Sequence, residues 1–184
     1  RDVAGAEPRG GIEDLLLASA QGVVASDPAA ATGSAHAIAL PAQPVPRTRR
    51  AEILAAAIPL FAHDGFAAVT NGQIAEAVGV APSALYRHYA GKVDILVAAC
   101  LQAAALLSQA VNQSLHDVSD PYAALLALAA TYVAYSFEHT ELTGVAEAEV
   151  VGLPDELRGP LTLAQREHIA VWERQLRLAR PELD

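Results

Sequence analysis

Residues 70–92, TNGQIAEAVGVAPSALYRHYAGK, carry helix start and stop signals so closely spaced that only short helices fit between them. Thr70 and Gln73 have the spacing of a capping box, which predicts a helix beginning there. Gly79 ends that helix, because glycine readily adopts the left-handed conformation of a helix end. Pro82 is typical of a first helical position and begins another helix. The sequence therefore predicts two short helices around a tight turn.

A third helix is expected just before this pair. Residues 49–63 place an apolar face at helical spacing and end before Gly65, a second C-cap glycine, although Pro59 is expected to kink the helix. The whole chain has 53% hydrophobic residues but only 5% aromatic ones, and it is rich in alanine, the best helix former. An all-α fold is therefore expected, in which a three-helix unit precedes a larger helical domain.

The composition divides the 184 residues into three parts. Residues 1–46 contain an amphipathic pattern over 12–25 and a linker with four prolines over 26–46. Residues 47–96 hold the three-helix unit, and residues 97–184 the remaining helices. Lys92 is expected to open a long helix that enters this last part and ends at about residue 116. Asp120-Pro121 is expected to cap and begin another helix.

The helix over residues 122–137 is apolar nearly all round, which predicts that it is buried on most sides as the spine of the larger domain. A shorter helix is expected over 142–151. Gly159-Pro160 is expected to break the chain before a last helix over 161–179. That helix is expected to be amphipathic, with Ile169, Trp172, Leu176 and Ala179 on its apolar face.

Charge is unevenly distributed along the chain, which has a net charge of -9. Residues 47–92 carry five Lys or Arg against three acids, whereas residues 93–184 carry five against thirteen. The only net-positive part therefore contains the paired short helices, which is compatible with a polyanionic partner but is also found in ordinary solvated helices.

Several function classes find no support in the sequence. No phosphate-binding glycine loop, nucleophile elbow or zinc spacing occurs, so we expect no enzyme activity, no metal and no cofactor. Cys100 is the only cysteine and lies among apolar residues, which indicates a buried thiol. The apolar run over 122–137 is too short for a bilayer, and no secretion leader is visible. A cytoplasmic protein without membrane association is expected.

A longer match covers the paired helices. Residues 61–96, FAHDGFAAVTNGQIAEAVGVAPSALYRHYAGKVDIL, resemble the N-terminal domain of TetR/AcrR-family transcriptional regulators. The resemblance implies a helix-turn-helix that binds a double-stranded DNA operator. Carried over position by position, with the preceding arginines, the expected DNA-binding residues are Arg49, Arg50, Thr70, Asn71, Pro82, Ser83, Ala84, Tyr86, Arg87, His88 and Lys92.

Within this set the resemblance implies a division of labour. Tyr86, His88 and Lys92 would contact phosphates, while Arg87 is the side chain able to make a bidentate contact to guanine. Tyr89 is expected to pack in the core. Two positions depart from the family pattern, because Ala81 and Gly91 stand where capping serines are common.

The resemblance further implies a ligand-responsive regulator, most simply a repressor released by a small apolar effector and acting as a homodimer. The expected effector pocket is lined by Tyr132, Tyr135, Phe137 and Trp172, which could equally be core residues. The family's C-terminal dimer helices have no counterpart before Asp184, and residues 1–28 resemble the tail of a preceding copy in a tandem protein.

One alternative function remains open. The missing caps and the scarcity of hydrogen-bonding side chains at the expected base-facing positions are also typical of a degenerate helix-turn-helix. Such a protein would act as a protein-interaction module without specific DNA binding.

Overall fold

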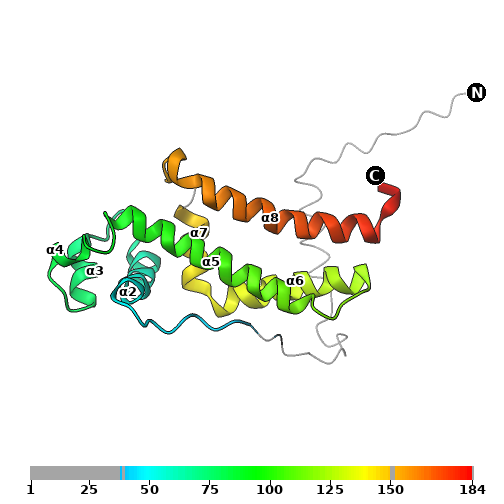
Figure 1. Cartoon of the computed structure of the whole chain (residues 1–184), viewed down its shortest axis with the longest axis horizontal. Helices are drawn as coiled ribbons and strands as arrows, with labels where there is room; N and C mark the ends of the chain where they lie inside the picture. The colour runs from blue at the N-terminus through cyan, green and yellow to red at the C-terminus, as the bar shows by residue number, and fades with distance from the viewer. Residues whose placement is uncertain (1–37, 39, 150–151, 184) are drawn as a thin grey trace, which may run out of the picture. The chain divides into compact units, whose positions relative to one another are not determined.

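A computed structural model describes residues 38, 40–149 and 152–183, in which all regular secondary structure is helical and no strand occurs. The sequence pattern over 12–25 and the start of the linker lie outside these residues. Figure 1 shows the helices in order along the chain. They are α2 (Arg49–Asp64), α3 (Asn71–Ala77), α4 (Pro82–Leu85), α5 (Lys92–Ser114), α6 (Pro121–Glu138), α7 (Thr140–Glu149), α8 (Asp155–Ala179) and the 3₁₀ turn η3 (Pro181–Leu183).

Helix boundaries follow the capping signals of the sequence. Thr48 caps α2 by accepting a hydrogen bond from the Ala51 amide, and Asp120 caps α6 by accepting one from the Ala123 amide at 2.7 Å. Pro121 occupies the first turn of α6, as expected. Gly65 and Gly79 have φ angles of 80° and 67°, which are strained for any residue with a Cβ atom.

Helix α5 is the centre of the fold. It packs against α2, α6, α7 and α8, and its buried residues include Ile95, Leu96, Ala99 and Cys100. By length and composition α5 is also the one helix within the described residues that could cross a membrane, with a mean hydropathy of 1.7. In this structure the surrounding helices make it the central helix of the core.

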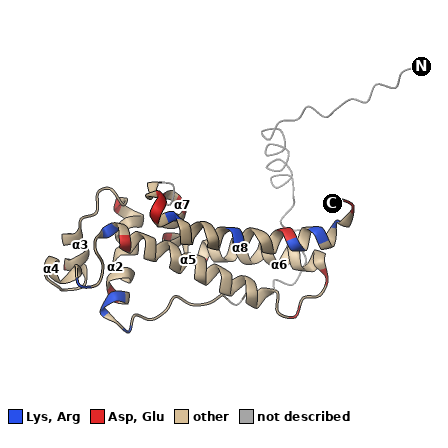
Figure 2. Cartoon of the chain, turned by 45° about the horizontal axis from the view of Figure 1, so that its top comes forward, with Lys and Arg blue, Asp and Glu red and all other residues tan. Residues whose placement is uncertain are grey.

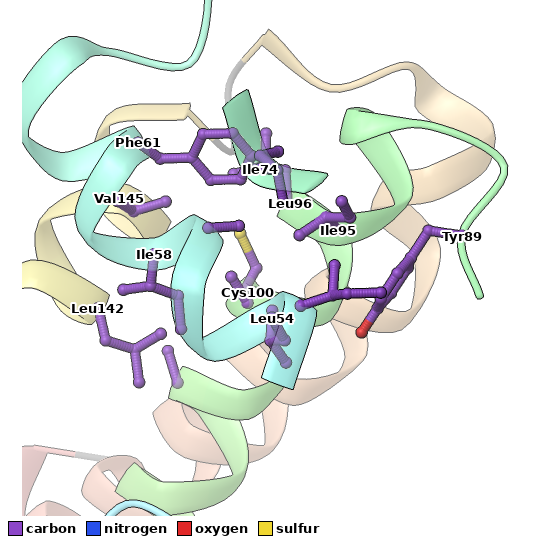
Figure 3. Close-up of a cluster of buried hydrophobic side chains, with 14 of the residues drawn as sticks. Leu54, Ile58, Phe61, Ile74, Tyr89, Ile95, Leu96, Cys100, Leu142 and Val145 are labelled. Atoms are coloured by element: carbon purple, nitrogen blue, oxygen red, sulfur yellow. The ribbon is translucent and has the colours of Figure 1, made fainter. Parts of the chain in front are cut away.

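The core runs without interruption from the three-helix unit into the larger helical part. Phe61 of α2, Ile74 of α3 and Leu85 of α4 belong to the same buried cluster as Leu142 and Val145 of α7. Figure 3 shows the two α7 side chains facing α2. Burial of a Leu or Ile side chain contributes about 1.5–3 kcal/mol, so this shared cluster holds the three-helix unit firmly on α5 and α7.

The expectation for α6 was wrong. Only Ala124, Leu128, Thr131 and Tyr135 are buried, and they recur at helical spacing along one face. Outside the core lie the opposite-face residues Tyr122, Leu126, Val133 and Phe137, which are 57%, 72%, 56% and 81% exposed. Apolarity all round the helix therefore did not mean burial all round, and α5 is the spine instead.

The break expected at Gly159-Pro160 was also wrong. Pro160 does not break the chain, because α8 is continuous from Asp155 to Ala179. Near the helix start, the missing proline N–H removes a single intrahelical hydrogen bond. The predicted apolar face is also only partly buried: Ala179 is 8% exposed, whereas Ile169 and Leu176 are 53% and 49% exposed.

A buried histidine joins the segment before α2 to the junction of α6 and α7. His139 is 4% exposed, its Nε2 atom lies 3.2 Å from the carbonyl oxygen of Pro41, and its ring packs on Tyr135 with centroids 4.8 Å apart. The chain that leads into α2 is thereby fixed to the far end of α6.

The caps generate a first prediction. Replacing Asp120 by alanine leaves the Ala123 amide of α6 without its partner and should lower the free energy of unfolding by about 0.5–2 kcal/mol. Urea denaturation followed by circular dichroism measures this change. The matched control is Asp117→Ala, since Asp117 has a 95% exposed side chain and caps no helix. Equal stability of both variants would contradict the capping role.

Candidate nucleic-acid interface

The first short helix is built by the predicted capping box. The Thr70 hydroxyl oxygen accepts from the Gln73 amide at 3.2 Å, and the Gln73 side-chain oxygen accepts from the Thr70 amide at 2.8 Å. The Thr70 hydroxyl also donates to that oxygen at 2.9 Å. Thr70 is therefore occupied in holding the start of α3, and a DNA contact would have to share the same hydroxyl.

The second short helix, α4, has one turn and is anchored by a buried side chain. Leu85 is fully buried, and the turn continues past the helix through hydrogen bonds from the Arg87 amide to Ala84 and from the His88 amide to Leu85. No side chain caps its start, because Ala81 has none to offer. Leu85, rather than a cap, therefore holds the helix in place.

The outward side of α4 carries most of the expected DNA-contacting residues. Pro82, Ser83, Tyr86 and Arg87 are exposed, while Ala84 and His88 are half-buried. Between Gly79 and Gly91 the chain contains no acidic residue, whereas Figure 2 shows acidic residues on α7 and α8. This surface can approach a phosphate backbone without like-charge repulsion.

Two arginines at the start of α2 brace the unit. Arg50 donates to the His88 carbonyl oxygen and stacks over the Tyr89 ring, with its guanidinium carbon 3.9 Å from the ring centroid. The Tyr89 hydroxyl donates back to the Arg50 carbonyl at 3.1 Å. Tyr89 is 3% exposed, as expected for a core residue, and this burial raises its pKa although the charge of Arg50 opposes the shift.

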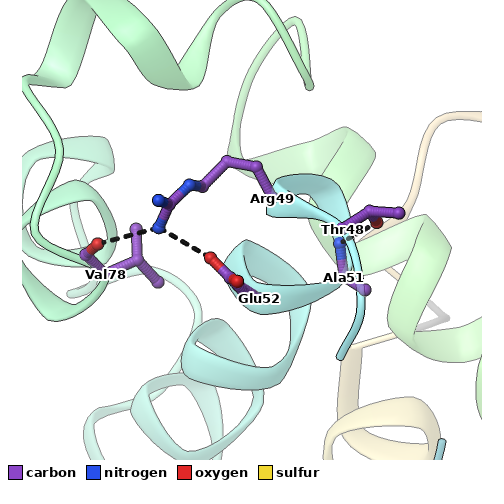
Figure 4. A network of polar contacts seen from close by, with 5 residues as sticks. All are labelled: Thr48, Arg49, Ala51, Glu52 and Val78. Atoms are coloured by element: carbon purple, nitrogen blue, oxygen red, sulfur yellow. Dashed lines mark hydrogen bonds and ion pairs between the residues drawn. The ribbon is translucent and has the colours of Figure 1, made fainter. Parts of the chain in front are cut away.

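Arg49 makes the corresponding contact on α3. Figure 4 shows its guanidinium between the Val78 carbonyl, at 3.2 Å, and the Glu52 carboxylate, at 2.6 Å. An arginine has five N–H donors, so both arginines keep donors for a phosphate while they fix the end of α3 and the end of the α4 turn. These bracing contacts were not predicted, since their acceptors are mostly backbone carbonyls.

Lys92 is placed differently from the expectation. Its ammonium group donates to the carbonyl oxygens of Phe66, Ala67 and Val69 at 2.7, 3.1 and 2.8 Å, and it lies 4.6 Å from the centroid of the Phe66 ring. An ammonium has three donors, and all three are directed at these carbonyls. In this structure Lys92 ties the loop before α3 to the start of α5, and the expected phosphate contact would require one of these bonds to break.

Asn71 and Tyr86 lie against each other across the turn. The Asn71 amide nitrogen donates to the Tyr86 hydroxyl oxygen at 3.1 Å, while the Asn71 side-chain oxygen is buried without a partner. Tyr86 itself is 56% exposed, so its ring stands at the surface between α3 and α4.

The four expected effector residues are not gathered around one cavity. Tyr132 stacks on His168, with centroids 6.1 Å apart, and Trp172 donates to the same histidine at 3.3 Å. Tyr135 is buried and donates to the Ala103 carbonyl at 2.8 Å, and burial raises its pKa to about 12. Phe137 is on the surface.

One open depression of about 640 Å³ lies elsewhere, along the side of α5 formed by Ala105, Ser108, Gln109, Asn112, Gln113 and His116. It contains none of the four expected residues. Among the residues that the structure describes, no cluster of three His, Cys, Asp or Glu could hold a metal ion.

The arrangement defines a class: a three-helix head with a helix-turn-helix over α3 and α4, built onto a helical domain. A sequence model of the family described as "Bacterial regulatory proteins, tetR family" matches residues 53–99, which cover most of this head. Residues 53–99 therefore match the DNA-binding domain of this family of transcriptional regulators. No match is found among curated protein sequences.

Solved structures with the same fold include two regulators of moderate identity. PfmR from Thermus thermophilus is 28% identical, with a TM-score of 0.63 and 68% of each chain covered. A tetR-family protein from Rhodococcus is 27% identical, with a TM-score of 0.65 and 69% of this chain and 67% of that chain covered. AibR, described in complex with isovaleryl coenzyme A and operator DNA, is 20% identical, with a TM-score of 0.68, covering 73% of this chain and 74% of that chain.

The Lys92 contacts generate a second prediction. Lys92→Met keeps the apolar stem but leaves three carbonyl oxygens without their donor, which should lower the free energy of unfolding by about 3 kcal/mol. Arg87→Met is the matched control, because Arg87 is exposed and its loss should change stability by no more than about 0.5 kcal/mol. Thermal denaturation compares the two, and a Lys92→Met chain as stable as the control would show that the three bonds are unimportant.

Proposed function

We propose that this protein is a ligand-responsive repressor whose residues 47–96 bind a double-stranded DNA operator and whose residues 97–184 bind a small apolar effector. The observation that carries the proposal is the outward face of α4, which exposes Ser83, Tyr86 and Arg87 on a firmly held turn free of acidic residues. A protein of the same fold, AibR, is described with both operator DNA and an acyl coenzyme A. We also propose a cytoplasmic location, since operator DNA lies there.

The exposed residues divide by chemistry. Arg87 can read guanine with two parallel hydrogen bonds, and Ser83 can bond to any base. Pro82 and Ala84 offer apolar contacts to thymine methyl groups. Tyr86, His88 and the spare donors of Arg49 and Arg50 would contact phosphates, which positions the head without reading sequence.

Salt dependence tests DNA binding. Arg87→Ala should weaken binding to a duplex from the protein's own promoter region. If Arg87 neutralises a phosphate, the slope of log K against log salt concentration should fall in magnitude by about one. If Arg87 reads guanine instead, discrimination between operator and random duplex should fall by roughly tenfold. Fluorescence anisotropy at several salt concentrations separates these effects. Arg174→Ala, an exposed arginine of α8, is the control and should change neither.

Failure of this experiment has a definite meaning. A chain that binds no duplex even at low salt would favour the second candidate, an interaction module with a degenerate helix-turn-helix. The observation on its side is the weak start of α4, where Ala81 supplies no cap and Pro82 and Ala84 supply no hydrogen-bonding side chain.

The effector site is proposed where α6 meets α8. Tyr132 stacks on His168 there, and Trp172 donates a hydrogen bond to the same ring. Helix α5 packs against both α6 and α8 and begins at Lys92, next to the head. A ligand that binds better to one arrangement of these helices would shift the head through α5.

The exposed stripe of α6 supports the proposed homodimer. Tyr122, Leu126, Val133 and Phe137 recur at helical spacing on one face, and no charged residue lies between Pro121 and Phe137. These side chains expose roughly 500 Å² per chain, so two copies would bury about 1,000 Å², the lower size of specific interfaces. An uncharged apolar surface is complementary to a second copy of itself.

Oligomeric state tests this surface. The double variant Leu126→Glu, Phe137→Glu should convert a dimer to a monomer in analytical ultracentrifugation, because four carboxylates would be brought together in the interface. Leu178→Glu, at a 56% exposed position of α8, is the control and should remain dimeric. A wild-type chain that is monomeric at tens of micromolar, or a double variant that stays dimeric, would exclude α6 as the dimer surface.

A further inference from the structure

The hydrogen bond between Asn71 and Tyr86 connects the first residue of α3 with the residue that ends α4. The donor is the Asn71 amide nitrogen and the acceptor is the phenol oxygen, at 3.1 Å. Since the phenol accepts this bond, it keeps its own proton. Tyr86 is 56% exposed, so that proton can be directed to a group outside the protein.

The side-chain oxygen of Asn71 shows that this residue is poorly placed to contact DNA bases itself. Its side-chain oxygen is buried and has no hydrogen-bond partner. A donor on a base cannot reach a buried oxygen, and one of the two amide N–H donors is already engaged with the phenol. In its present position Asn71 could therefore contact DNA only through its second N–H.

We propose that Asn71 is a positioning residue, which holds the Tyr86 phenol so that its proton is donated to a DNA phosphate. This inference rests on the proposed DNA binding and assigns a specific route for one phosphate contact. The series runs from the Asn71 N–H to the Tyr86 oxygen, and from the Tyr86 O–H to a phosphate oxygen.

Two physical effects make a phenol that accepts this hydrogen bond bind a phosphate more strongly than an isolated phenol would. A hydroxyl that accepts a hydrogen bond becomes a better donor, because successive hydrogen bonds polarise one another. The same bond restricts rotation of an exposed side chain before DNA arrives, so less freedom is lost on binding. If the amide were reversed, the phenol would donate its proton to the Asn71 oxygen. That proton would then not be available to a phosphate.

The experiment is a double-mutant cycle on the full chain. Asn71→Ala, Tyr86→Phe and the double variant are titrated by fluorescence anisotropy against a mixed-sequence duplex of about 30 base pairs at several salt concentrations. We expect Tyr86→Phe to weaken binding about tenfold and Asn71→Ala about three- to tenfold. In the Tyr86→Phe chain, adding Asn71→Ala should change affinity less than twofold.

The salt slope distinguishes this route from a loss of charge or of fold. Neither residue carries a charge that releases counterions, so both variants should weaken binding by the same factor at every salt concentration. The matched control is Asn112→Ala, at an exposed position of α5 outside the head. This control should bind like the wild type.

A second substitution covers the case in which Asn71→Ala does not fold. Asn71→Asp keeps the shape of the side chain but cannot donate, and it accepts the phenol's proton. Asn71→Asp should weaken binding more in the wild-type background than in the Tyr86→Phe background. In the Tyr86→Phe background only the negative charge of the new aspartate acts.

Different failures have different meanings. Additive losses from the two single variants would show that Asn71 contacts DNA independently, and this would overturn the proposal. An Asn71→Ala chain that binds like the wild type while Tyr86→Phe is weakened would overturn it as well. A wild-type chain that binds no duplex at low salt would refute the proposed function and, with it, this inference.

Discussion

One ammonium group joins the loop before α3 to the start of α5. Lys92 donates to three carbonyl oxygens of this loop, those of Phe66, Ala67 and Val69, where the loop meets the first turn of α5. Buried or half-buried carbonyls need donors, and a single charged side chain meets three of these needs at once. The position of α3, and with it that of the turn and α4, depends on this loop.

In the remaining contacts of the head, too, single side chains hold neighbouring segments in place. Arg49 and Arg50 donate to backbone carbonyls at the end of α3 and after α4, and Leu85 and Tyr89 anchor α4 from the apolar side. Side chains expected to contact DNA therefore also build the surface that presents it. Stability and binding are linked in this head, so the effect of a substitution on binding can be interpreted only beside its effect on folding.

Local signals in the sequence were sufficient for the helix boundaries but not for the packing. The Thr70–Gln73 box and the Asp120 cap are short-range interactions between neighbouring residues, and both were confirmed. The all-α class and the resemblance of the head to the tetR family were confirmed as well. Which helix occupies the centre depends on its tertiary neighbours, so α6 was wrongly expected to be the spine. The acceptors of Lys92 are backbone atoms, which have no sequence pattern. The DNA and effector contacts stay predictions.

The continuous core has a consequence for how a signal would travel. Leu142 and Val145 of α7 belong to the same buried cluster as the apolar residues of α2 and α3, with no loose segment between them. Protein interiors are close-packed and of low compressibility, so a displacement of α7 is passed to α2 with little loss. The head would then behave as a rigid lever whose orientation changes, rather than as a flexible arm whose order changes.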